Sequence, residues 1–260
     1  MFAENSCRRL SCHGQLDVRG DRSASIDSVR LYRSRGFNRN PARIRPSSYA
    51  RRSEVKSQAE KLRVLILGAA GEGDLRVGRE QKRIRAAVQS ALHRDQIMFD
   101  VRPAATPADL LDGISKFRPH VVHFSGHSDN DFLVFEQDTD GPNSGIDVAA
   151  GAFARAIQAT DAPPLLVLLN SCNSAAQIDD LVAEVVPFAI GMADEIDDGD
   201  AINYAAQFYA SIADGQSIKS SHLSGRSALE LAGLSGADLP TLACAPDVDP
   251  SVTILVKAME

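Results

Sequence analysis

The chain has 260 residues, of which 44% are hydrophobic and 24% are charged, so it can bury a sizeable core. Its four cysteines are too few and too scattered for the dense disulfide framework of a small secreted domain. No run of about 18 apolar residues is available to span a bilayer, and the first residues lack the apolar core of a signal peptide. We therefore expect a soluble protein of the reducing cytoplasm that makes no membrane contact.

The formal net charge of −6 is unevenly distributed along the chain. Residues 1–60 carry 13 basic and 6 acidic side chains, and residues 61–260 carry 15 basic and 28 acidic ones. The first segment is rich in Arg and Ser and has no persistent helical or strand period, which predicts a disordered basic extension. It leaves two interpretations open: electrostatic contact with nucleic acid or an acidic partner, and an unstructured extension or a mis-assigned start codon. Cys7, Cys12 and His13 lack the second ligand pair of a zinc site, so we expect no metal there.

From residue 61 onward, apolar strands alternate with amphipathic segments, and this alternation predicts an α/β fold with a parallel sheet covered by helices. The Thr106-Pro107 pair is typical of a helix start. Strands are expected at 64–67, 97–101, 120–125, 165–170, 187–192 and 252–256, a short hairpin between 132–136 and the region around 146, and helices at 78–93, 106–117, 148–159, 175–184, 200–214 and 217–232.

Two of these strands end in potentially reactive side chains. One closes with His123-Phe124-Ser125-Gly126-His127, and another is followed by Ser171-Cys172-Asn173. Open α/β sheets build their sites at the carboxyl ends of strands, so a dyad of His127 with a nucleophilic Cys172 is the first hypothesis. The alternative is that Cys172 is a small buried residue. His123 lies inside its strand and is expected to be a core histidine.

Two loops at the same predicted edge have less specific patterns. The glycine-rich segment 68–73 follows the first strand, but its spacing differs from the dinucleotide motif, and Glu72 and Asp74 would repel phosphate. The acidic segment 194–200 is open to two interpretations. It is either a solvated loop that caps the next helix, or a source of a carboxylate that receives a basic substrate side chain.

The sequence resembles the CHAT family of caspase-like cysteine peptidases over most of residues 61–248. The resemblance is carried by an ordered set of segments. They are Leu75-Arg76-Val77-Gly78-Arg79-Glu80, Pro119 to His127, Leu169-Asn170-Ser171-Cys172-Asn173-Ser174, Ala189-Ile190-Gly191-Met192 with the acidic loop after it, and Phe208-Tyr209 before Ala213-Asp214-Gly215.

The resemblance implies a caspase-like three-layer α/β/α sandwich with a mostly parallel central sheet. It implies a dyad of His127 and Cys172, with the backbone N–H groups of Ser128 and Cys172 holding the oxyanion. The family usually has glycine where this chain has Ser128. Asp198 matches an acidic position of the family and implies substrate binding, with cleavage after basic residues. No cofactor or metal is required.

The function implied is a cysteine endopeptidase acting on a protein substrate, as a bacterial effector in a defence or cell-death system. An activating sensor or partner protein is expected, because the chain shows no sensor domain of its own. Two alternatives remain: a catalytically silent caspase-like binding module, and a flavodoxin-like nucleotide binder.

Overall fold

The computed structural model describes residues 60–70, 73–141 and 143–257, so the predicted extension lies outside the described residues except for Glu60. The strands of these ranges are β1 Leu62–Gly68, β2 Ile97–Arg102, β3 Val121–Ser125, β4 Phe132–Phe135, β5 Ile146–Ala149, β6 Leu166–Asn170, β7 Phe188–Met192 and β8 Pro240–Cys244. The α-helices are α1 Val77–Gln89, α2 Pro107–Asp112, α3 Ala150–Gln158, α4 Ala175–Glu184, α5 Asp198–Ala213 and α6 Ile218–Leu231.

Within the described residues the main sheet has six strands in the order β2-β1-β3-β6-β7-β8. Strands β2, β1, β3, β6 and β7 run parallel, and β8 pairs antiparallel with β7 at the edge. The carboxyl ends of β1, β3, β6 and β7 therefore meet at one edge. The expected α/β fold with a mostly parallel sheet is confirmed, and β4 and β5 form the expected antiparallel hairpin.

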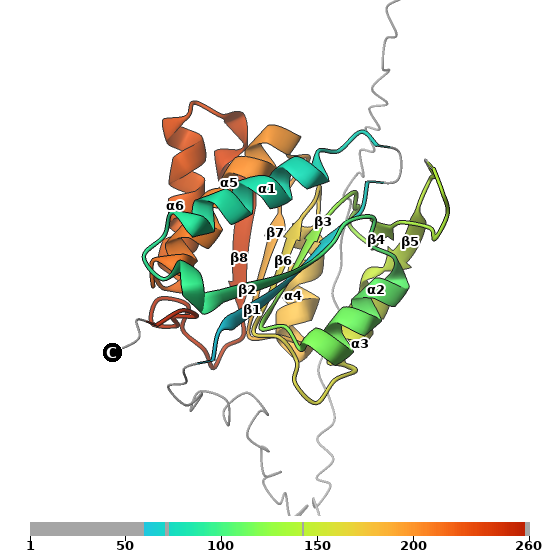
Figure 1. Ribbon diagram of the computed structural model, residues 1–260, viewed down its shortest axis with the longest axis horizontal. Helices are drawn as coiled ribbons and strands as arrows, with labels where there is room; N and C mark the ends of the chain where they lie inside the picture. The colour runs from blue at the N-terminus through green and yellow to red at the C-terminus, as the bar shows by residue number, and fades with distance from the viewer. Residues whose placement is uncertain (1–59, 71–72, 142, 258–260) are drawn as a thin grey trace, which may run out of the picture. The chain divides into compact units, whose positions relative to one another are not determined.

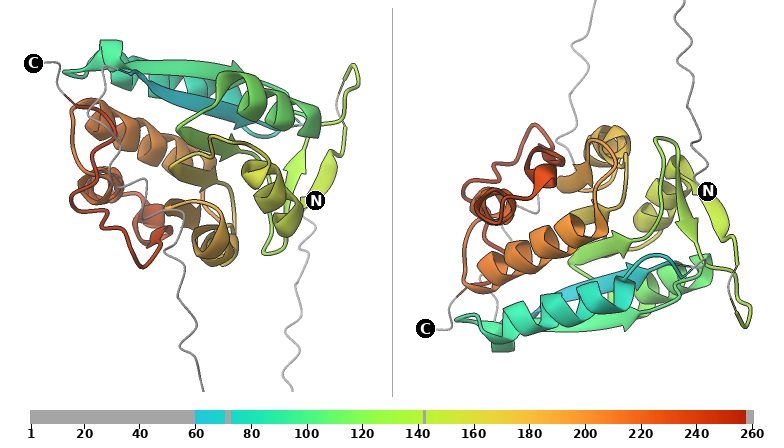
Figure 2. Two further views of the ribbon diagram at one scale, coloured as in Figure 1. Left: turned by 90° about the horizontal axis from the view of Figure 1, so that it is seen from below. Right: turned by 90° about the horizontal axis from the view of Figure 1, so that it is seen from above.

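The sheet is buried on both faces because its central strands are apolar at successive positions. In β1, Val64 and Ile66 pack in the cluster under α1, α5 and α6, whereas Leu65 and Leu67 pack in the cluster under α2, α3 and α4. This alternation produces the three layers visible in Figure 1, with helices on both sides of the sheet. Helices α1 and α5 run side by side over one face (Figure 2).

Helix boundaries follow local signals where these are strong. The Thr106 side chain caps α2 and forms a reciprocal capping box with Asp109, as the Thr-Pro start predicts. The helix then continues as a π-helical turn through Phe117. Helix α1 ends at Gln89, earlier than expected, and Leu92 beyond it is 77% exposed.

The strand expected at 252–256 is wrong. This segment forms turns, and its Ile254 makes only an isolated antiparallel bridge with Ser217. The place at the sheet edge is taken instead by β8, whose side chains are mostly half-buried or exposed and therefore show a weak apolar pattern. No helix in the described ranges has both the length and the apolar character needed to cross a membrane.

Candidate active site

The sheet register places His127 and Cys172 at corresponding positions. Ser125 of β3 and Asn170 of β6 are partners in the parallel pairing, and each candidate residue lies two positions beyond its strand's last paired residue. Paired strands lie about 4.8 Å apart, so the two loops leave the sheet edge as neighbours.

Side-chain bonds join these two loops directly. The Ser128 hydroxyl hydrogen-bonds the carbonyl oxygen of Cys172 and lies 2.7 Å from the Ser171 hydroxyl. The Gln177 side-chain amide of α4 donates to the Asp129 carbonyl oxygen at 2.7 Å. The loop after β3 is thus held against the turn that carries Cys172.

The turn at Cys172 is shaped by a left-handed residue and a buried serine. Asn173 has φ of 55°, and the Ser174 hydroxyl, fully buried, accepts from the Met192 N–H at 3.0 Å. A Cβ at Gly191 would lie 2.8 Å from the Ser174 backbone, so β7 can approach this turn only with glycine there. Helix α4 begins directly after this turn, with Ser174 as its N-cap.

Cys172 is half-buried and its thiol is not in a disulfide. Its Sγ lies 3.8 Å from the carbonyl oxygen of Ile196, in the loop between β7 and α5. The thiol therefore lies beside the acidic segment 194–200.

The His127 imidazole is anchored by a carboxylate that the sequence interpretation did not assign to the site. Its Nε2 lies 3.0 Å from Oδ2 of Asp74, in the segment between β1 and α1. Burial raises the pKa of Asp74, but the hydrogen bond and charge of His127 together with backbone N–H groups lower that pKa below its usual value. An ionised carboxylate only accepts, so Nε2 is the donor in this contact.

The predicted oxyanion site includes the backbone N–H of Ser128, which follows His127. Ser128 and Leu133 form an isolated antiparallel bridge, closed by bonds from Val134 N–H to the His127 carbonyl and from Asp129 N–H to the Phe132 carbonyl. The Ser128 N–H takes no part in these two bonds. An open hollow of about 200 Å³ lies next to the imidazole, lined by Ala69, His127, Val134, Phe135 and residues 143–145.

Asp198 lies at the same sheet edge, as the first residue of α5 rather than in the preceding loop. Its Oδ1 accepts from the Arg76 N–H at 3.4 Å, which links the starts of α5 and α1. Burial raises the pKa of Asp198, the Arg76 N–H opposes this, and the nearby Glu80 charge raises the pKa further. No cluster of three or more metal-ligating side chains occurs among the described residues.

The family model of the CHAT domain matches residues 34–221. The chain belongs to the CHAT family. Part of the matched range lies before residue 60, in the segment predicted to be an extension. A comparison with curated proteins found no match.

Among solved structures, this CHAT chain is similar to the crystal structure of gingipain R, described as an Arg-specific cysteine proteinase. The TM-score is 0.53 at 10% identity, and the match covers 74% of this chain and 47% of that chain. The complex of the pro- and mature domains of Porphyromonas gingivalis RgpB matches with a TM-score of 0.49 at 9% identity, over 75% of this chain and 49% of that chain. The similarity to gingipain R shows that the CHAT chain has the caspase-like cysteine-peptidase fold, and the chain spans about half the length of that protein.

Two acids of the CHAT site were not identified from sequence. The sequence indicates Asp74 only as a group that repels phosphate, and it indicates Glu80 only within the segment 75–80 of the family resemblance. The available signal for Asp74 was an acid shortly after β1, a strand that ends at the same edge as β3.

Proposed function

We propose that this CHAT chain is a cysteine endopeptidase in which Cys172 is the nucleophile and His127 the general base and acid. The observation that carries the proposal is the paired register of β3 and β6, with the two loops beyond it bonded through Ser128. Asp74 orients the imidazole through Nε2.

The reaction follows from these positions. The Cys172 thiol gives its proton to His127, and the sulfur adds to the carbonyl carbon of the scissile peptide bond. The oxyanion is held by the N–H groups of Ser128 and Cys172. The C–N bond breaks as His127 passes the proton to the leaving amine. Water then adds to the thioester with His127 taking its proton, the C–S bond breaks, and the proton returns to the sulfur.

For the substrate, we propose cleavage after basic residues, with Asp198 receiving the positive side chain. Support comes from the carboxylate's place at the start of α5, close to the loop that contacts the Cys172 thiol. The Arg specificity named for gingipain R, a protein of the same fold, agrees with this assignment. The biological role proposed is that of a bacterial defence or cell-death effector in a reducing cytoplasm, switched on by a sensor or partner protein.

The test uses the full chain with fluorogenic peptides that differ only in the residue before the scissile bond. We expect cleavage after Arg or Lys that is lost in Cys172→Ala and His127→Ala. The matched control is Cys244→Ala, which removes the exposed thiol on β8 and should leave cleavage unchanged. Equal cleavage by the parent chain and Cys172→Ala would refute the proposal. The substitution Asp198→Asn should reduce cleavage after Arg relative to cleavage after Leu.

The second candidate is a catalytically silent binding module, favoured by the Ser128 side chain that ties the two loops together where the family usually has glycine. An Arg-containing peptidyl acyloxymethyl ketone separates the two functions. Covalent labelling of Cys172 supports the peptidase. Absence of labelling, while iodoacetamide still modifies Cys244, supports the silent module.

A further inference from the structure

A buried carboxylate joins the two strands that lead to the proposed dyad. Glu80, in the first turn of α1, is 2% exposed. Its Oε1 lies 3.0 Å from His123 Nε2 and accepts from Asn170 Nδ2 at 2.5 Å, and its Oε2 accepts from the Ser125 hydroxyl. One side chain of α1 thus bonds two residues of β3 and one of β6.

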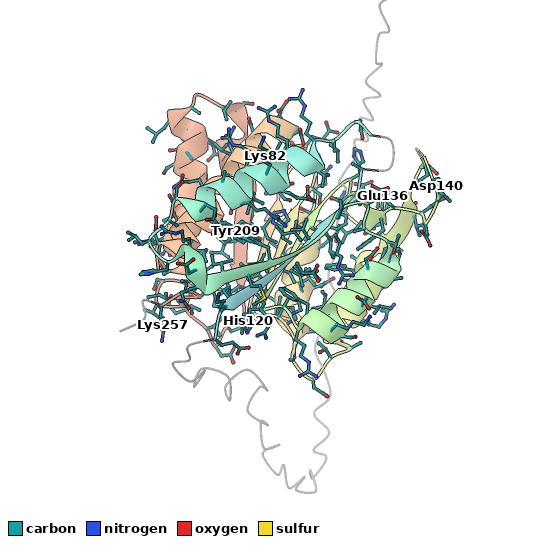
Figure 3. All side chains as sticks on the ribbon, in the orientation of Figure 1. Lys82, His120, Glu136, Asp140, Tyr209 and Lys257 are labelled. Carbon is teal, nitrogen blue, oxygen red and sulfur yellow. The ribbon has the colours of Figure 1, made fainter. Side chains whose placement is uncertain are left out.

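The network continues into the neighbouring helix. His123 Nδ1 lies 3.2 Å from the hydroxyl of Tyr209, which is labelled in Figure 3 and comes from α5. Asn170 Nδ2 also donates to the Ala201 carbonyl oxygen of α5 at 3.1 Å. The bonds therefore connect α1, β3, β6 and α5 on one face of the sheet.

A buried carboxylate is costly unless donors satisfy it, and well-packed apolar side chains often stabilise a core equally well. Stability alone therefore does not explain this network, and its location at the ends of β3 and β6 indicates a role in positioning the loops that follow. Ser125 and Asn170 are partners in the strand register and the last residues of β3 and β6. Strand pairing holds the chains up to this point, and Glu80 adds a side-chain link across the last pair.

We infer that Glu80 is a positioning residue, whose carboxylate locks the ends of β3 and β6 in register so that His127 and Cys172 face each other. This inference rests on the proposed function for its catalytic consequence. Glu80 acts through Ser125 and Asn170.

The conservative variant for this role is Glu80→Gln. Its amide oxygen can replace Oε1 and accept from His123 and Asn170, and its NH₂ can replace Oε2 because the Ser125 hydroxyl can turn and accept. Glu80→Ala removes all three bonds. A role in positioning is thus retained by Gln and lost with Ala.

The experiment compares amide hydrogen exchange and peptide cleavage in the parent chain, Glu80→Ala and Glu80→Gln. For Glu80→Ala we expect exchange at residues 126–130 and 171–174 to accelerate about tenfold or more, while exchange in the distant helix α3 stays within about twofold. We expect kcat to fall about tenfold or more with KM within about threefold, because binding groups stay in place. Glu80→Gln should restore both readouts most of the way.

The matched control is Tyr204→Phe, which removes another buried hydrogen bond of α5, to His222 Nδ1 at 2.8 Å. It should lower stability without changing exchange in the two loops or kcat. If Glu80→Ala does not fold, Ser125→Ala removes one arm of the network and should loosen the same two loops.

Two results would overturn the inference. One is parent-like exchange in both loops of folded Glu80→Ala. The other is acceleration that is equal in all elements, helix α3 included, because that pattern reports only a loss of global stability. A parent chain without peptidase activity would refute the proposed function. The exchange result would still decide the role of Glu80.

Discussion

The pairing of Asp74 with His127 predicts a small, salt-sensitive contribution to the reactivity of Cys172. The Nε2–Oδ2 distance is 3.0 Å, and the two side chains are 43% and 50% exposed. Ion pairs this exposed contribute about 0.2–1 kcal/mol. At the upper end this amounts to about a fivefold effect on the population of the productive imidazole. Asp74→Asn should therefore slow alkylation of Cys172 by about 1.4- to fivefold.

The assay is the second-order rate of iodoacetamide modification of Cys172, followed by mass spectrometry, with Cys244 as an internal reference. The matched variant is Asp131→Asn, which removes an exposed acid from the loop before β4 and changes the net charge equally. In about 1 M salt the Debye length falls to about 3 Å, so the Asp74→Asn effect should shrink. Equal rates for the parent chain and Asp74→Asn at low salt, or a loss above about a hundredfold, would refute this reasoning, because neither fits an exposed pair.

Other predictions concern stability. Ser128→Ala removes the bond to the Cys172 carbonyl and should lower the unfolding free energy by about 1 kcal/mol, seen as a fall in Tm of about 2–4 °C; an unchanged Tm would contradict the contact. Gly191→Ala should destabilise by about 1–3 kcal/mol in chemical denaturation because its Cβ meets backbone at 2.8 Å. The control Gly78→Ala, with open space around its Cβ, should stabilise by about 0.5 kcal/mol. Burial lowers the pKa of His222 to about 4 in the folded chain. As the pH falls, the unfolded chain therefore protonates His222 before the folded chain does. Stability should fall by up to about 3 kcal/mol between pH 6.5 and 4, and His222→Asn should flatten that part of the profile. Identical profiles for the parent chain and His222→Asn would rule out this cause.

Elements with a strong local signal could be predicted from sequence. Helix α4 coincides with the expected range 175–184, because its apolar spacing and the preceding polar turn are both local features. Strand β8 could not be predicted, because an edge strand with half-exposed side chains has little apolar pattern and depends on the neighbour that it pairs with. The apolar segment at 252–256 has a strand-like composition and forms turns instead.

For the candidate site, the sequence identified the two strand ends that carry His127 and Cys172. It did not identify the side chains that contact these strand ends and loops. His127 and Cys172 each follow an apolar run, and the rule that parallel strands end at one edge is enough to place both residues at that edge. Asp74 could not be assigned, because its partner depends on β1 lying next to β3 in the sheet. Glu80 could not be assigned either, because an acid in the first turn of a helix is common and its local sequence gives no sign of burial.

Sequence by itself determined the α/β class, most strands and helices, and the two strand ends that carry His127 and Cys172. These features follow from hydrophobic periodicity, which is local, and from the general rule that parallel strands end at one edge of a sheet. Tertiary structure alone decided the strand order, the contact of Asp74 with His127 and the burial of Glu80 between β3 and β6. The physical reason is distance along the chain. Glu80 and Asn170 are 90 residues apart, and their contact exists only once α1 has packed across the sheet.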